Sequence, residues 1–246
     1  MAVTGARARP GKGAVRALAV DVDGTLADDS RRINLDAVRA LRRVQDSGVP
    51  VMLASGNVLP IAYSLSNYLG LTGPIIAENG GIVCHEQKIY VLGDPRGPLK
   101  AYKHLQTKMD ADRLFTDKWR ETEVGLKREV SLDKVKDILK DWDVEVETTG
   151  WAVHIMKKGM NKLVGIRKGC DLLGISVKEV AAIGDSDNDE MMIRECGWGI
   201  AVANAFDGTK SAASYVSRNK NGLGVLEALE WLRLIERQQR STNGFR

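Results

Sequence analysis

The sequence predicts an α/β protein: a doubly wound parallel sheet with an inserted smaller α+β domain. Short apolar runs alternate with amphipathic segments over residues 15–83 and again over 159–238. Between them, over residues 84–158, apolar and polar residues alternate within short runs. The first pattern is typical of buried parallel strands joined by helices, and the second of half-buried antiparallel strands. At 246 residues, the chain is long enough for one large domain or two modest ones.

The first half of the predicted core follows a strand–helix–strand–helix–strand order. The apolar run at 15–22 is too short for a helix and fits a buried strand. Asn34 can cap the next helix, whose apolar positions recur every three residues until Gly48 ends it. The next predicted elements are a strand at 49–54, a helix at 59–69 that stops at Gly70, and a strand at 74–77.

The inserted domain is predicted to start within a hairpin. Its strands lie at 82–84 and 89–92, and a helix follows at about 98–109. Residues 110–130 show no readable pattern. Ser131 can cap a helix that runs to about residue 140, and two alternating strands at 144–147 and 152–156 complete the unit.

The parallel pattern then resumes. We expect helices at about 161–173, 187–195 and 223–238, and strands at 180–183, 199–203 and 215–217. The predicted core therefore spans 15–83 and 159–238, with flexible tails at 1–14 and 239–246.

Composition excludes several kinds of protein. The formal charge is +4, but residues 1–16 and 237–246 hold seven basic residues, which leaves 29 basic against 32 acidic residues between them. A nucleic-acid-binding body is therefore disfavoured. No apolar run approaches the roughly 18–20 residues that span a bilayer. The three cysteines, far apart, form neither a disulfide framework nor a CxxC zinc site, so we expect a cytoplasmic protein.

An acidic pair directly follows the first predicted strand. Asp21 and Asp23 alternate with valines, so their side chains lie on one side of the strand and repel unless a cation or a shared proton relieves them. Gly24 then lets the chain turn away. One carboxylate can attack phosphorus while a second transfers protons. The alternatives are a turn with two solvated acids, or a calcium loop, which Thr25 at its fifth position and the lack of a glutamate at its twelfth disfavour.

A second acidic cluster follows the strand at 180–183. Asp185, Asp187 and Asp189 lie within five residues, and the first and last of them can face one ligand at a helix start. Carboxylate oxygens suit Mg²⁺. A single acid there would only offset the helix dipole, but three exceed that need.

Two further positions are typical of a phosphate site. Ser55 and Gly56, after the second strand, can offer a hydroxyl and backbone N–H groups to a phosphate, although taken alone Ser55 is better explained as a capping serine. Lys162 begins the helix after the insertion and would place a positive charge beside the carboxylates, although most lysines are simply solvated.

Together these motifs resemble the haloacid dehalogenase superfamily of phosphatases with an aspartate nucleophile. Four segments occur in the order of that family's four motifs: DVDGT at 21–25, Ser55 with Gly56, Lys162, and GDSDND at 184–189. The insertion between the second and third motifs implies a type-two cap. Three features make the chain most similar to archaeal-type phosphoglycolate phosphatases: the compact insertion, the sequence SGN at 55–57 and the sequence ENGG at 78–81.

The resemblance implies a metal and two catalytic carboxylates. Mg²⁺ would be held by the Asp21 carboxylate, the Asp23 backbone carbonyl, Asp185 and Asp189. Asp21 would attack phosphorus, and Asp23 would protonate the leaving oxygen and then activate water.

It also implies a substrate, a small phosphorylated metabolite. Ser55, the Gly56 amide and Lys162 would stabilise the transferring phosphoryl group, and Asn188 would orient Asp21 or the substrate unless it serves only the turn. The best guess for the substrate is 2-phosphoglycolate, with a sugar phosphate as the alternative. A phosphomutase is disfavoured, as is a catalytically silent module that binds an anion or Mg²⁺ and regulates a partner. No nucleic acid or membrane is expected to be a partner, and the sequence is compatible with a homodimer.

Overall fold

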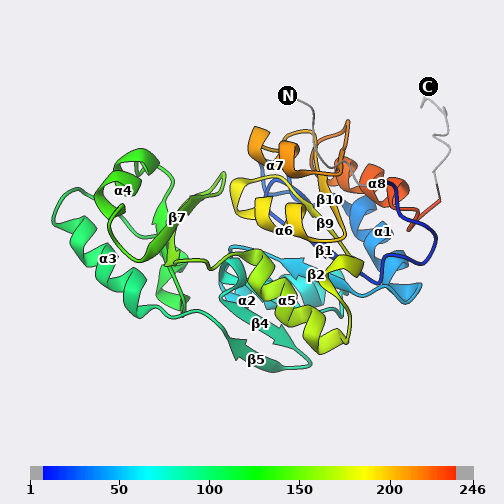
Figure 1. Ribbon diagram of the computed structural model, residues 1–246, viewed down its shortest axis with the longest axis horizontal. Helices are drawn as coiled ribbons and strands as arrows, with labels where there is room; N and C mark the ends of the chain where they lie inside the picture. Colours follow the sequence, from blue (N-terminus) through cyan, green and yellow to red (C-terminus); the bar gives the residue numbers. More distant parts are fainter. Residues whose placement is uncertain (1–7, 237–246) are drawn as a thin grey trace.

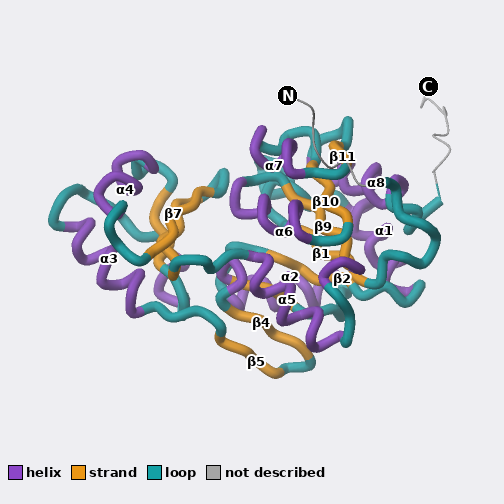
Figure 2. The backbone as a smooth tube through the Cα atoms, viewed as in Figure 1, coloured by secondary structure: helices purple, strands orange, loops and turns teal. Residues whose placement is uncertain are grey.

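A computed structural model describes residues 8–236 and contains two sheets (Figures 1 and 2). The larger has eight strands in the order β11-β10-β9-β1-β2-β3-β4-β5, and the smaller has three in the order β6-β8-β7. The strands of the larger sheet are β1 (Ala17–Val20), β2 (Val51–Ala54), β3 (Ile75–Ala77), β4 (Ile82–His85), β5 (Lys88–Val91), β9 (Val180–Gly184), β10 (Trp198–Ala201) and β11 (Tyr215–Val216). The predicted α/β fold with a parallel core sheet is confirmed.

The strand register brings the motif-bearing strand ends together. β1 lies between β2 and β9, parallel to both, with Val20 opposite Leu53 on one side and Ile183 on the other. The carboxyl ends of the three strands therefore lie at one edge of the sheet, where an open α/β sheet binds its ligands. All residues of the three strands are buried, as expected of a parallel sheet covered on both faces.

Helices cover both faces of this sheet (Figure 1). One apolar cluster joins Leu18, Val20 and Leu53 to the helices of one face, and another joins Ala19, Met52 and Ala182 to those of the other. The helices of the first face are α1 (Leu35–Asp46), α2 (Leu59–Leu69) and α8 (Asn221–Trp231), and those of the second include α5 (Lys162–Leu173) and α6 (Glu190–Glu195). A short helix that the sequence did not predict, α7 (Asp207–Ala212), packs beside α6 and β10.

The hairpin at the insertion boundary belongs to the core sheet. β4 pairs antiparallel with β3, and β5 pairs with β4, so both strands extend the eight-stranded sheet. The sequence analysis placed the insertion from residue 84 and so assigned the second strand to the wrong unit. The alternating pattern of β5 identifies an antiparallel strand but not its partner, and the insertion instead begins after β5.

The inserted domain is built on β6 (Val124–Lys127), β7 (Val144–Thr148) and β8 (Ala152–Lys157). Its helices α3 (Arg96–Gln106) and α4 (Leu132–Leu139) pack on one face through a cluster that includes Val153 and Ile155. The alternate residues Ala152 and His154 therefore point to the other face, where they line a cavity. The stretch at 110–130, unreadable in the sequence, holds a 3₁₀ turn at Phe115–Trp119 and strand β6.

The ends of the described chain differ from expectation. Residues 8–14 belong to a stretch predicted to be a flexible tail, yet the indole Nε1 of Trp198 donates to the Ala8 carbonyl at 3.2 Å, and Arg9 bonds the carbonyls of Glu230 and Trp231. The last helix, predicted to reach residue 238, ends at Trp231. The rest of the predicted tails, 1–7 and 239–246, lies outside the described residues. Within 8–236, no helix combines the length and apolarity needed to cross a membrane.

Candidate active site

Three carboxylates meet at the carboxyl edge of the sheet. Asp21 follows β1, and Asp185 and Asp189 follow β9. One oxygen from each lies within 4.8 Å of the others, and all three side chains are buried. The two acidic motifs, more than 160 residues apart in the sequence, therefore form one cluster.

Lys162 lies against this cluster. Its Nζ atom donates to Oδ1 of Asp21 and to Oδ1 of Asp189, each at 2.6 Å, and its side chain is 1% exposed. Asn161 caps α5 by accepting from the backbone N–H of Leu163, which fixes the first turn from which Lys162 projects. Burial alone would lower the pKa of Lys162, but Asp189 and Asp21 reverse this and raise the pKa above its ordinary value, so the ammonium is charged.

Local contacts orient the two later carboxylates. Asp189 Oδ2 accepts from the backbone N–H of Asp185 at 3.0 Å and from that of Ser186 at 3.1 Å. Asp185 Oδ1 accepts from the Thr25 hydroxyl at 2.6 Å. Gly24 has φ +91°, and a Cβ there would lie 2.3 Å from Asp185 Oδ2, so the turn after β1 requires glycine for both conformation and space.

The cluster fits a divalent cation. Burial, followed by the charge of Asp189, raises the pKa of Asp185 to about 7. Burial also raises the pKa of Asp21, with Asp189 and Asp185 adding to the effect and Lys162 opposing it. Oδ2 of Asp21 is buried and accepts no hydrogen bond from the described residues. One ammonium thus leaves the three carboxylates under-neutralised, and their hard oxygens are suited to Mg²⁺.

The second predicted motif lies beside the first. Ser55, at the end of β2, is 1% exposed, and its Oγ accepts from the backbone N–H of Asn57 at 3.0 Å. The Asn57 side chain donates to Oδ2 of Asp23 at 2.8 Å. Asp23 is half-buried and lies outside the group of three carboxylates that could share an ion.

A buried polar network joins this site to the inserted domain. Asn188 Nδ2 donates to Asn79 Oδ1 at 2.9 Å, and Asn79 Nδ2 donates to Glu123 Oε2 at 2.9 Å. Glu123 also pairs with Arg120, and its Oε1 lies 3.0 Å from Nδ1 of His154. Burial would raise the pKa of Glu123, but His154 and Arg120 together lower it. Glu123 is thus the ionised centre of the network.

The network also reaches the turn at 55–57. Arg120 Nη1 donates to the Gly56 carbonyl at 2.9 Å, which ties the inserted domain to the Ser55–Asn57 turn. Glu78 accepts from the backbone N–H groups of Glu121 and Thr122 and from the Thr122 hydroxyl. Glu78 therefore connects the two domains and takes no part in the carboxylate cluster.

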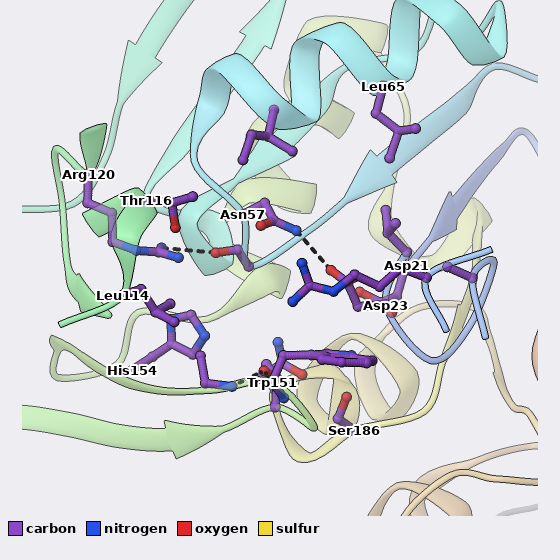
Figure 3. Close-up of a pocket in the computed structure, with 18 of the residues that line it drawn as sticks. Asp21, Asp23, Asn57, Leu65, Leu114, Thr116, Arg120, Trp151, His154 and Ser186 are labelled. Atoms are coloured by element: carbon purple, nitrogen blue, oxygen red, sulfur yellow. Dashed lines mark hydrogen bonds between the residues drawn. The ribbon is translucent and has the colours of Figure 1, made fainter. Parts of the chain in front are cut away.

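A cavity of about 470 Å³ lies between the core and the inserted domain (Figure 3). The core residues that line it include Asp21, Asp23, Asn57, Leu65 and Ser186. Those of the inserted domain include Leu114, Thr116, Arg120, Trp151 and His154. A ligand whose phosphate lies at Asp21 would therefore extend its other end between the two domains.

The structure brings most of the predicted residues together. The carboxylate cluster contains Asp21, Asp185 and Asp189, and Lys162 donates hydrogen bonds to the first and last of these. Asn188 belongs to the polar network beside the cluster. Asp187 is exposed and outside the cluster. The roles assigned to these residues, including the Asp23 carbonyl as a metal ligand, stay predictions.

The contacts of several other site residues could not be predicted from the sequence. Thr25 and Asn57 stand within or next to the motifs, but nothing in their spacing shows which carboxylate each contacts. Arg120 and Glu123 fall in the stretch with no readable pattern, so no signal pointed to them. Asn204, which analogy with the family expects near this loop, donates to the Gly24 carbonyl at 2.8 Å and supports the turn that carries the first motif.

Comparison with known proteins agrees with this geometry. The chain matches the profile of the haloacid dehalogenase-like hydrolases over residues 18–107 and 101–229. It belongs to that family. A phosphoglycolate phosphatase of Methanothermobacter thermautotrophicus is 40% identical over 215 residues, which cover 87% of this chain and 97% of that protein. Another, from Archaeoglobus fulgidus, is 37% identical over 222 residues, covering 89% and 98%.

Two solved structures have a similar fold. The Thermoplasma acidophilum protein 0175 has a TM-score of 0.83 at 29% identity, covering 90% of this chain and 99% of its own. A sugar phosphatase of HAD subclass IIB has a TM-score of 0.76 at 19% identity, covering 90% and 100%. At that identity the second likeness concerns the fold alone. The family resemblance predicted from the four motifs is confirmed.

Proposed function

We propose that this protein is a Mg²⁺-dependent phosphomonoester hydrolase that converts 2-phosphoglycolate and water to glycolate and phosphate. The observation that carries the proposal is the convergence of Asp21, Asp185, Asp189 and Lys162 on one buried point at the sheet edge. The names of the relatives at 40% and 37% identity support the choice of substrate.

The arrangement suits a two-step transfer through Asp21. A carboxylate oxygen of Asp21 forms a bond to phosphorus as the bond from phosphorus to the substrate oxygen breaks, and Asp23 gives that oxygen a proton. Asp23 then takes a proton from water, whose oxygen bonds to phosphorus and releases the Asp21 carboxylate. Lys162 holds Oδ1 of Asp21, which fixes the carboxylate's orientation. The Asn57 amide holds Asp23 in the same way.

The residues that would hold Mg²⁺ are Asp21, Asp185, Asp189 and the Asp23 carbonyl. The ion would supply positive charge that offsets the phosphate oxygens and the three carboxylates. Lys162 would add a fixed positive charge, and the Ser55 hydroxyl with the Gly56 amide would donate hydrogen bonds to the phosphoryl group.

A sugar phosphate is the second candidate substrate. The cavity of about 470 Å³ has room for a leaving group larger than glycolate. Ranking kcat/KM over a panel of phosphorylated metabolites separates the two candidates: the best value belongs to 2-phosphoglycolate under the first proposal and to a hexose phosphate under the second.

The experiment that tests the proposed chemistry is release of phosphate from 2-phosphoglycolate with Mg²⁺, by the wild type and by Asp21→Asn. We expect the variant to lose at least about 10⁴-fold in kcat, because it lacks the nucleophile. Asp29→Asn changes an exposed acid after the same motif and serves as the control. Wild-type-like turnover by Asp21→Asn, with an unchanged circular dichroism spectrum, would refute the nucleophile. A wild type that hydrolyses no phosphate ester would support the silent regulatory module instead.

A further inference from the structure

The cavity contains one cationic side chain with no acidic partner. Arg31, Arg120 and His154 all line it. Arg120 and His154 are both engaged with Glu123. Arg31 forms no ion pair with any carboxylate of residues 8–236, and the contact of its guanidinium is with the ring of Trp151, whose centroid lies 4.6 Å from Cζ.

The loop that carries Arg31 is held in one conformation. Asp28 Oδ1 accepts from the backbone N–H groups of Ser30 and Arg32, at 2.9 and 3.0 Å. The Arg31 N–H donates to the Asp28 carbonyl at 2.8 Å. These bonds fix the turn between Ala27 and Ile33, which pair across it as an isolated bridge. The position of the Arg31 backbone at the rim of the cavity is therefore set before any ligand binds.

The backbone at Arg31 is strained. Its φ is +59°, a left-handed conformation that is unfavourable for a residue with a Cβ and that glycine or asparagine adopts more easily. Turn geometry alone therefore does not favour arginine here. Strain of this kind persists where the surrounding structure enforces it, and it is commonly found at ligand-binding sites.

We propose that Arg31 determines substrate specificity by binding a carboxylate on the leaving group, with Trp151 supporting its guanidinium from the inserted domain. The inference rests on the proposed function. A planar guanidinium can bind a carboxylate through two parallel hydrogen bonds, and one that lies over an aromatic ring keeps the N–H groups at its edge free to do so. The site would therefore prefer phosphate esters of small hydroxy acids to neutral phosphate esters.

The size of the cavity means that selection of a small hydroxy-acid leaving group requires a charged contact. At about 470 Å³ it is much larger than a two-carbon leaving group, so steric fit cannot select one. At the core end, Lys162 and the predicted metal site would take the phosphate. Arg31 is then the cation left to pair with a second negative charge on the ligand.

The test compares two substrates that differ only in this charge: 2-phosphoglycolate and 2-hydroxyethyl phosphate, whose neutral hydroxymethyl group replaces the carboxylate. The measured quantity is the ratio of their kcat/KM values. Arg31→Gln should lower the preference for 2-phosphoglycolate about 30-fold, as expected for loss of a charge-assisted hydrogen-bonded pair. Arg31→Lys, which keeps the charge but not the planar fork, should lower it less.

Arg32→Gln is the matched control, because Arg32 follows Arg31 in the same turn and is exposed like it but does not line the cavity. It should keep the wild-type ratio. An unchanged ratio in Arg31→Gln, or an equal fall for both substrates, would overturn the role of Arg31 and leave the phosphatase proposal intact. Failure of the wild type to hydrolyse 2-phosphoglycolate would overturn both.

Discussion

Lys162 Nζ lies 2.6 Å from Oδ1 of Asp21, although the two residues are 141 positions apart and the whole inserted domain lies between them in the sequence. Lys162 begins α5 directly after that domain, and Asp21 directly follows β1. The inserted domain can therefore occupy the middle of the chain without interrupting the site, because the chain leaves and re-enters the core at the same edge of the sheet.

Replacing Lys162 with methionine should reduce both stability and activity. The substitution leaves the buried carboxylates of Asp21 and Asp189 without their ammonium partner. Breaking a buried ion pair in this way costs about 3 kcal/mol. Guanidinium-induced unfolding in the presence of a chelator should show this loss in the free energy of unfolding, and kcat should fall with Mg²⁺ present. Lys158→Met, an exposed lysine of the same connection, is the control and should leave both near wild type.

Gly24→Ala should weaken metal binding as well as stability. The added Cβ would lie 2.3 Å from Asp185 Oδ2, in a backbone with φ +91°. Gly48 has the same φ of +91° but nothing within 4 Å of its Cβ position, so Gly48→Ala measures the backbone strain alone. That strain costs about 1 kcal/mol. We expect Gly24→Ala to lose more than Gly48→Ala in thermal unfolding, and to require more Mg²⁺ for half-maximal activity. Equal Mg²⁺ requirements in the two variants would contradict the contact with Asp185.

The part of the candidate site that lies in the core could be predicted from the sequence because its residues fall in short motifs. The two acidic motifs, at 21–25 and 184–189, each place carboxylates and turn residues directly at the end of a buried strand, and parallel strands align their carboxyl ends. The core helices follow from apolar periodicity for the same reason, and the prediction for 59–69 coincides with α2.

The inserted domain could not be predicted as well, because its functional contacts are long-range. Glu123 meets Asn79 of the core and His154 of β8, 44 and 31 positions away. Strand β6 is four residues long and contains Gly125, too short for a period to show. Trp151 lines the cavity against the guanidinium of Arg31 from the core, another contact between residues distant in the sequence. The partner of β5 also depends on tertiary pairing that alternation does not encode.

The pH dependence of stability should reveal the charge of Glu123. His154 and Arg120 lower its pKa below the ordinary value of 4.5, even though burial opposes them. A carboxyl group with a depressed pKa in the folded state stabilises the protein above its unfolded-state pKa, and that contribution is lost as the pH falls through the folded-state value. Glu123→Gln should therefore cost about 3 kcal/mol at pH 7, and progressively less below about pH 4.5.

Denaturant unfolding of wild type and Glu123→Gln at pH 7 and pH 3.5 measures this difference. Glu121→Gln is the control, because Glu121 is exposed two residues away and its side chain lies outside the network. A difference between wild type and Glu123→Gln that stays constant between the two pH values would show that Glu123 is not ionised in the folded protein.

Mg²⁺ should stabilise the folded protein through the three carboxylates. A cation shared by Asp21, Asp185 and Asp189 would offset the repulsion from Asp189, which adds to burial in raising the pKa of Asp185 to about 7. A ligand at 100 times its dissociation constant stabilises the native state by about 2.7 kcal/mol, so the thermal midpoint should rise with added Mg²⁺ and fall with chelator. Asp185→Asn should remove most of the rise, because it deletes one ligand and leaves the other two in place. Asp29→Asn should keep it, since that acid is exposed and outside the cluster. A full Mg²⁺-induced shift in Asp185→Asn would place the ion elsewhere.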